Sequence, residues 1–225
     1  PALWALLLAC AKSVPQLNER MHAGHWDKAT HKSLELGGRT VGLVGLGAIG
    51  LRFAKMADAL GMRVIGYDPF AKNLPAYVQA VDLETIWRES DAVSLHCPLT
   101  DDNRGMLNAA TLAQCKRGVI VVNTARGGLI DEADLLAAVR SGQVMAAGLD
   151  SFAVDKGEAD ALLRLRNARH CGKCGHGVQH QRLPGQRAVL LRATRPRARA
   201  AARARHQTKE PHRCGHIRQE HRQSQ

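Results

Sequence analysis

The sequence predicts an α/β fold, a doubly wound parallel sheet with helices on both faces. Two observations predict it. Short apolar stretches alternate with helix-like stretches from residue 40 to residue 150, and such alternation implies a parallel sheet covered by its crossover helices. In addition, a glycine-rich run from Gly45 to Gly50 joins the first apolar stretch to the first helix-like one.

Five short segments are expected to form the sheet. They are rich in apolar residues, as strands buried on both faces must be. Because parallel strands end at one edge of a sheet, ligands of such folds bind there. The expected strands are Thr40–Val44, Arg63–Tyr67, Ala92–His96, Val119–Asn123 and Val144–Leu149.

Helix signals lie between these strands. Acidic residues at Asp131–Asp134 mark the start of one helix, and Gly142 marks its end, because the helix dipole favours anions at the amino end. Asn108 is expected to cap a second helix over Ala109–Cys115, with Gly118 beyond its end.

The chain opens with an apolar run, Ala2–Ala11. This run is too short to span a bilayer, and it lacks the basic segment that begins a signal peptide. A buried amphipathic helix is the better interpretation, because apolar residues recur at helical spacing. These residues are Leu3, Leu6, Leu7 and Cys10. Because the first residue is Pro1 rather than Met, we expect a fragment or a processed product.

The glycine-rich run has the spacing G-x-G-x-x-G, with a helix-like segment, Leu51–Leu60, after it. Gly45 permits a tight turn out of the strand, Gly47 leaves room for a pyrophosphate, and Gly50 allows close packing of the new helix. The free amides of the helix start then face the anion. The run therefore predicts a Rossmann-like, dinucleotide-binding domain.

Asp68 follows the second expected strand, about 20 residues after the glycine-rich run, where a ribose-binding carboxylate is expected. No Arg stands beside it, and a carboxylate would repel a 2′-phosphate, so NAD is favoured over NADP. The alternative is a simple turn at the strand end, formed with Pro69.

Three further segments end the later strands: Ser94–Thr100, Asn123–Gly128 and Gly148–Phe152. Together with the glycine-rich turn they resemble the D-isomer-specific 2-hydroxyacid dehydrogenases, and among them the phosphoglycerate dehydrogenase-like members, over about residues 1–155. The resemblance implies an NAD-dependent oxidoreductase acting on the CH–OH group of a D-2-hydroxy acid and on its 2-oxo acid. It also implies a homodimer in the intact family.

The resemblance assigns roles to individual residues. Arg126 would bind the carboxylate and the carbonyl of the substrate, which suits a planar guanidinium; the alternative is a surface arginine. Asp68 would bind the adenosine ribose. The remaining positions would contact the cofactor: Ala48 and Ile49 at the pyrophosphate, and Cys97, Thr124, Ala125 and Asp150 along the cleft. His96 is expected to be a structural residue at a strand end.

The family also uses a Glu–His pair for proton transfer. Asp155, followed by Lys156, stands at the family's Glu position, and it is one methylene shorter than Glu. The family's His position falls on Lys173. His170 and His176 are near, but neither follows a proline or a strand, so the catalytic His is not identified.

Charge divides the chain. Residues 1–155 hold 15 Lys/Arg against 16 Asp/Glu, whereas residues 156–225 hold 17 against 4 and have no aromatic residue other than His. Such a segment buries too little apolar area to offset its conformational entropy, so a largely disordered basic tail is expected. The expected division is 1–35 helical linker, 36–155 NAD-binding domain and 156–225 tail. A shift of reading frame near Val154–Lys156 would explain the break.

Other functions compete with this interpretation. Cysteines and histidines of the tail offer a zinc site or a nucleic-acid module, but no packed core surrounds them, so no metal and no specific nucleic acid are expected. These residues are Cys171, Cys174, His176, His180, His212, Cys214 and His216. A domain that binds NAD without catalysis is the further alternative. Six cysteines in such a chain favour a reducing cytoplasm over a disulfide scaffold, and no membrane partner is expected.

Overall fold

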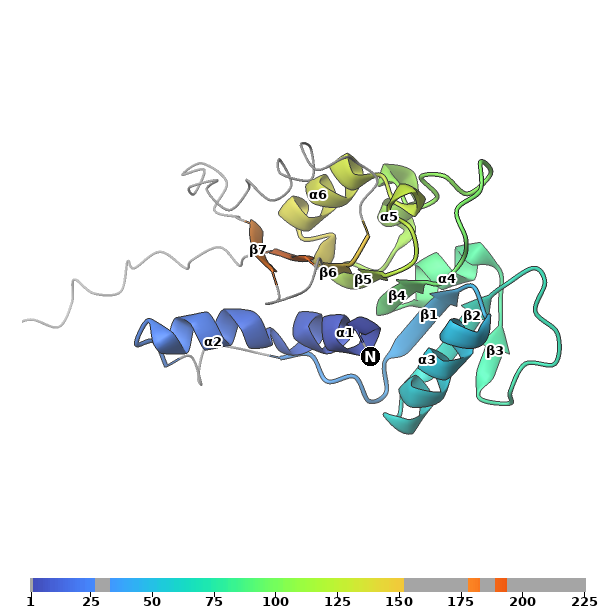
Figure 1. Cartoon of the computed structure of the whole chain (residues 1–225), viewed down its shortest axis with the longest axis horizontal. Helices are drawn as coiled ribbons and strands as arrows, with labels where there is room; N and C mark the ends of the chain where they lie inside the picture. Colours follow the sequence, from blue (N-terminus) through green and yellow to red (C-terminus); the bar gives the residue numbers. More distant parts are fainter. Residues whose placement is uncertain (1, 27–32, 152–177, 183–188, 194–225) are drawn as a thin grey trace, which may run out of the picture.

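The computed structural model describes residues 2–26, 33–151, 178–182 and 189–193. One sheet runs through this part in the order β3-β2-β1-β4-β5-β6-β8-β7 (Figure 1). The first six strands are parallel, and their order is that of doubly wound dinucleotide-binding sheets. The predicted fold class is therefore confirmed. The strands are β1 (Thr40–Val44), β2 (Arg63–Tyr67), β3 (Val78–Ala80), β4 (Ala92–Leu95), β5 (Val119–Asn123), β6 (Val144–Leu149), β7 (Val178–Arg182) and β8 (Val189–Ala193).

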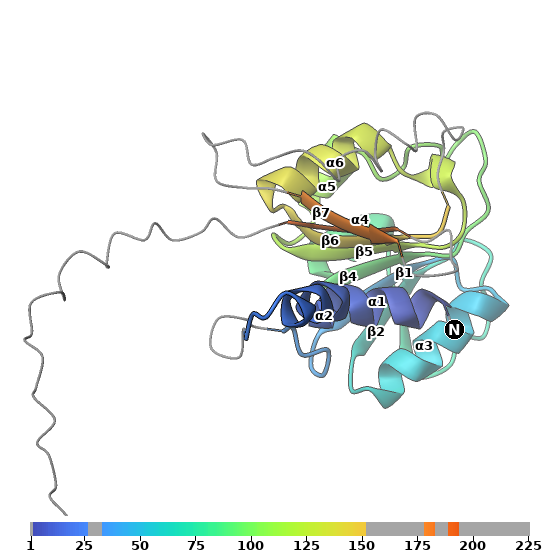
Figure 2. The ribbon, with the colours of Figure 1, turned by 60° about the vertical axis from the view of Figure 1, so that its left-hand side comes forward.

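Helices cover both faces of this sheet. α1 and α3 lie on one face and α4, α5 and α6 on the other, as Figures 1 and 2 show. Two apolar cores result, one with Phe53 and the other with Trp87. The helices are α1 (Ala2–Lys12), α2 (Val14–His22), α3 (Ala48–Ala59), α4 (Leu83–Glu89), α5 (Ala109–Gln114), α6 (Glu132–Ser141) and the short 3₁₀ turn η1 (Gly127–Leu129).

The predicted helix ends are confirmed by their caps. The Asn108 side chain accepts hydrogen bonds from the N–H groups of Ala110 and Thr111, and Asp131 accepts one from Asp134 at 2.9 Å. Gly142 ends α6 with φ 75°, a left-handed conformation that glycine adopts without strain. Local caps therefore mark where α5 and α6 begin, and at α5 the Ala109 N–H also donates to the more distant Asp134 Oδ2 at 2.8 Å.

Helix α1 is buried, as the sequence predicts, but it is not amphipathic, because its exposed positions Ala5 and Leu8 are apolar as well. Leu6, Leu7 and Cys10 are almost fully buried, and α1 packs on β5 and β6. A Cβ on Gly148 of β6 would stand 2.8 Å from the Cβ of Leu6, so the glycine allows this close approach. α1 thus shares a hydrophobic core with the sheet. The expected boundary at residue 35, between a helical linker and the NAD-binding domain, stays a prediction.

Three strands were not predicted from the sequence. β3 pairs with β2 in parallel at one edge. At the other edge β8 pairs antiparallel with β6, with Leu149 opposite Val189, and β7 pairs with β8. Apart from β7 and β8, the tail that the sequence predicts to be largely disordered lies outside the described residues. Within those ranges, no helix is long and apolar enough to cross a membrane.

Candidate functional site

The glycine-rich turn is packed to atomic contact. Gly45 has φ 99°, and a Cβ there would lie 2.8 Å from the backbone nitrogen of Cys97. A Cβ on Gly50 would overlap the carbonyl oxygen of Gly45. The predicted tight turn is thus present, and the close approach at Gly50 is between α3 and the turn itself. Any side chain at either position would push the turn out of place.

The outer side of the same turn is open. A Cβ on Gly47, the residue that caps α3, would have no described atom within 4 Å. No described side chain caps the amino end of α3, and the Ile49 side chain next to it is 70% exposed. Unpaired amides at the start of a twelve-residue helix attract an anion. The residues present therefore fit a bound diphosphate.

Asp68 is joined to this turn by hydrogen bonds. The Leu46 N–H donates to its Oδ2 at 2.8 Å, and the Phe70 N–H donates to its Oδ1 at 2.9 Å. The Gly45 N–H donates to the Tyr67 carbonyl at 2.8 Å. Each carboxylate oxygen can accept a further hydrogen bond, so Asp68 stands at the turn with acceptors left for hydroxyl groups.

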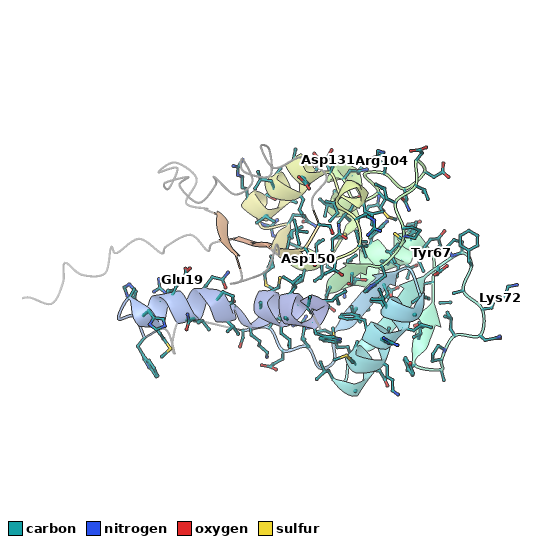
Figure 3. All side chains as sticks on the ribbon, viewed as in Figure 1. Glu19, Tyr67, Lys72, Arg104, Asp131 and Asp150 are labelled. Carbon is teal, nitrogen blue, oxygen red and sulfur yellow. The ribbon has the colours of Figure 1, made fainter. Side chains whose placement is uncertain are left out.

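A cleft of about 230 Å³ continues from the turn across the carboxyl edge of the sheet. It brings together predicted site residues from three elements: Ile49 of α3, Cys97 after β4, and Thr124, Ala125 and Arg126 after β5. Leu95, His96 and Pro98 complete its lining. Figure 3 marks Tyr67 and Asp150 at the ends of β2 and β6, on either side of the strands that form the cleft.

The loop that carries Arg126 is held from below by Asn123, which is fully buried. The Asn123 Oδ1 accepts from the Ala125 N–H at 3.0 Å, and its Nδ2 donates to the Arg126 carbonyl at 2.9 Å. The Arg126 side chain is exposed, with Nη1 donating to the Ala125 carbonyl at 2.8 Å. The Asp150 N–H donates to the Asn123 carbonyl at 3.0 Å. Sequence reasoning missed this support, although a buried Asn before a loop often bonds backbone two residues on.

Burial favours the neutral forms of two side chains that line the cleft, His96 and Cys97. It lowers the pKa of His96 to about 4. It also raises the pKa of Cys97, and the nearby Asp68 carboxylate raises it further. An uncharged thiol is a poor nucleophile, which agrees with the expectation that Cys97 lines the site. A neutral, half-buried His96 agrees with a structural role.

Other predicted residues fall outside the described ranges. Asp155 is one, and so are the cysteines and most histidines of the considered zinc site; only the backbone of His180, in β7, is described. Among the described residues, no group of three or more His, Cys, Asp or Glu side chains is placed to hold a metal ion.

Comparison with known proteins decides the family. The model of the family described as "D-isomer specific 2-hydroxyacid dehydrogenase, NAD binding domain" matches residues 4–171. The chain belongs to the D-isomer specific 2-hydroxyacid dehydrogenase family. The NAD cofactor and the fold expected from the sequence are thereby confirmed for this domain, and 2-hydroxy and 2-oxo acids are the substrates of the family.

Two relatives and one solved structure give the extent of the likeness. The chain is 48% identical to hydroxypyruvate reductase of Thermotoga maritima over 150 residues, 67% of this chain and 49% of that protein. It is 41% identical to D-3-phosphoglycerate dehydrogenase of Rattus norvegicus over 173 residues, 76% of this chain and 32% of that one. Apo D-lactate dehydrogenase of Escherichia coli superimposes with TM-score 0.66 at 31% identity, covering 75% of this chain and 53% of that chain. The matched part thus spans between 32% and 53% of the length of these three proteins.

Proposed function

We propose that this chain supplies the NAD-binding half of a D-2-hydroxyacid dehydrogenase, which transfers hydride between the nicotinamide and C2 of a 2-hydroxy acid. The cleft supports this function best, because it runs from an open, anion-binding turn to an exposed guanidinium, Arg126. Relatives named for hydroxypyruvate and 3-phosphoglycerate favour a small, three-carbon acid. We assign this chemistry to residues 36–155, with residues 1–35 as a helical linker and 156–225 as a tail.

Each residue around the cleft has a part in binding. Amides at Ala48 and Ile49 bind the diphosphate through the open side of the turn left by Gly47. Asp68 accepts from the hydroxyl groups of the adenosine ribose. Cys97, Thr124, Ala125 and Asp150 line the path toward the nicotinamide, where the neutral Cys97 thiol excludes water without adding charge.

Arg126 binds and orients the substrate in this proposal. A guanidinium can donate two parallel hydrogen bonds to a 2-oxo acid. This orients the carboxylate and draws electron density from the carbonyl that accepts hydride from NADH. A proton must reach the same oxygen as hydride arrives, and Asp155 stands at the family position of the acid that supports the proton donor.

Binding and turnover are separable, so the test has two steps. Cofactor binding is measured by titrating the chain with NADH and recording the change in NADH fluorescence. Oxidation of NADH at 340 nm, with hydroxypyruvate, 3-phosphohydroxypyruvate or glyoxylate, measures hydride transfer. We expect binding and oxidation with at least one acid. Binding without oxidation of any of the three would contradict the enzyme proposal for this chain and favour a domain that binds NAD without catalysis. Failure to bind NADH would contradict both.

We also propose a homodimer in the cytoplasm. Apolar side chains are exposed along α2 and just after it: Val14 by 57%, Met21 by 60% and Trp26 by 75%. Such a stripe favours burial against another surface, and the free thiols of Cys97 and Cys115 suit a reducing compartment. Light scattering should give a dimer mass for the chain and a monomer mass for Met21→Glu. Equal masses would contradict this interface.

A further inference from the structure

His96 directly follows β4 and lies under the glycine-rich turn. A Cβ on Gly45 would stand 2.8 Å from the His96 carbonyl carbon, and one on Gly50 would stand 3.6 Å from the His96 Cβ. The His96 N–H donates to the carbonyl of Val44, the last residue of β1, at 2.7 Å. His96 therefore contacts the strand before the turn, the turn, and the first turn of the helix after it.

The imidazole ends a row of packed rings. Its centroid lies 5.6 Å from that of Phe53 in α3, at an angle of 44°. Phe53 in turn stacks on Trp4 of α1, with centroids 4.4 Å apart, and both are more than nine-tenths buried. Figure 2 shows α1 and α3 on the same side of the sheet. The start of α3 is thus held between α1 and His96.

The charge of the ring does not account for its place, nor does a hydrogen bond of its Nε2 within the described residues. Its Nε2 has no hydrogen-bond partner among the described residues, and burial holds the imidazole neutral at physiological pH. A cation beside the amino end of α3 would also oppose the helix dipole. The volume of the side chain does account for it, because the ring packs beside Phe53 and the His96 Cβ stands below Gly50.

We propose that His96 is a positioning residue for the diphosphate of the bound dinucleotide. Its ring is a wedge that fixes the first turn of α3 relative to β1 and β4, and so fixes the direction of the amides at Ala48 and Ile49. Hydrogen bonds weaken steeply when donors lose alignment, so a small shift of this turn weakens diphosphate binding. The inference rests on the proposed function, because it takes the turn to be the diphosphate site.

The test compares ligands with and without a diphosphate. Dissociation constants of NADH, ADP and adenosine are measured by calorimetry on the full chain and on His96→Ala and His96→Leu. For His96→Ala, which removes the wedge, we expect NADH and ADP to bind at least about tenfold more weakly, and adenosine to bind within about twofold of the unchanged chain. For His96→Leu, which has nearly the volume of the ring, all three constants stay within about threefold.

A buried substitution on the other face of the sheet is the control. Val139→Ala in α6 also removes buried volume, and it should leave all three constants unchanged in the folded protein, with folding followed by circular dichroism. If His96→Ala weakens adenosine as much as ADP, or weakens neither, the positioning role is wrong. Weak binding by His96→Leu would also overturn it, because the ring nitrogens would then be needed. If the unchanged chain binds neither NADH nor ADP, the proposed function itself fails, which is a distinct result.

Discussion

The two halves of the cleft are built in different ways. On the α3 side the turn is made of backbone in contact with backbone, so that Gly45 and Gly50 have no room for a Cβ. On the β5 side the loop is held by one buried side chain, Asn123, and presents one exposed side chain, Arg126. Substitutions in the first half should therefore damage fold and cofactor binding together, whereas the second half separates stability from chemistry.

The largest effect is expected at Gly50. Gly50→Ala places a Cβ against the Gly45 carbonyl, and relief requires α3 to move from the turn. We expect the free energy of unfolding to fall by about 3 kcal/mol, with loss of NADH binding. Chemical denaturation and NADH titration measure the two effects. Gly47→Ala is the matched control, because its Cβ meets open space; it should keep stability and lose NADH affinity. Equal stability of Gly50→Ala and the unchanged chain would contradict this packing.

A second effect of similar size is expected from pH. The His96 pKa is lowered by burial from 6.5 to about 4, so the unfolded chain takes up a proton at a higher pH than the folded chain does. His96 therefore does not reduce the free energy of unfolding above pH 6.5. As the pH drops toward about 4, its protonation in the unfolded chain lowers that free energy by about 3 kcal/mol in all. Denaturation curves of His96→Leu supply the comparison, because carboxylates titrate in both proteins. If the two proteins lose stability in parallel, burial of His96 does not have this consequence.

A smaller loss of stability is expected at Asn123. Asn123→Ala removes the hydrogen bonds to Ala125 and Arg126 and leaves a backbone donor and a carbonyl without their partner. We expect a loss of about 2 kcal/mol and weaker binding of 2-oxo acids, with NADH affinity changed far less. Asn123→Asp keeps the acceptor for Ala125 but not the donor to Arg126. Because Asn123 is fully buried, this change also buries a carboxylate against the Arg126 carbonyl, and it should cost at least as much stability as Asn123→Ala at neutral pH. A stability equal to that of the unchanged chain in both variants would show that the loop does not depend on the Asn123 side chain.

The sequence predicted features that depend on near neighbours in the chain, and it did not predict features that depend on distant residues. Local signals sufficed for the strands β1, β2, β5 and β6, for the caps Asn108 and Asp131, and for the glycine spacing, because each depends on near neighbours in the chain. The wedge of His96 against Phe53 and Trp4 depends on residues far apart in sequence, and no periodicity reveals it. β3 and the β8–β6 pairing were missed for a similar reason, since short edge strands owe their form to the strand beside them.

The smallest effect on stability is expected at Arg126, which is where the largest effect on chemistry should lie. Its side chain is exposed and bonds only the neighbouring carbonyl of Ala125 among the described contacts, so Arg126→Ala should change the free energy of unfolding by less than about 0.5 kcal/mol. Hydroxypyruvate binding in the presence of NAD⁺, where no hydride can move, should weaken by about tenfold to a hundredfold, because hydrogen bonds between charged groups are lost. Arg126→Lys keeps the charge but not the planar fork, and should recover only part of this affinity. Arg140→Ala, an exposed arginine of α6, controls for net charge. Unchanged binding in Arg126→Ala would show that the substrate carboxylate is held elsewhere, and the β5 loop would then have no part in the site beyond lining it.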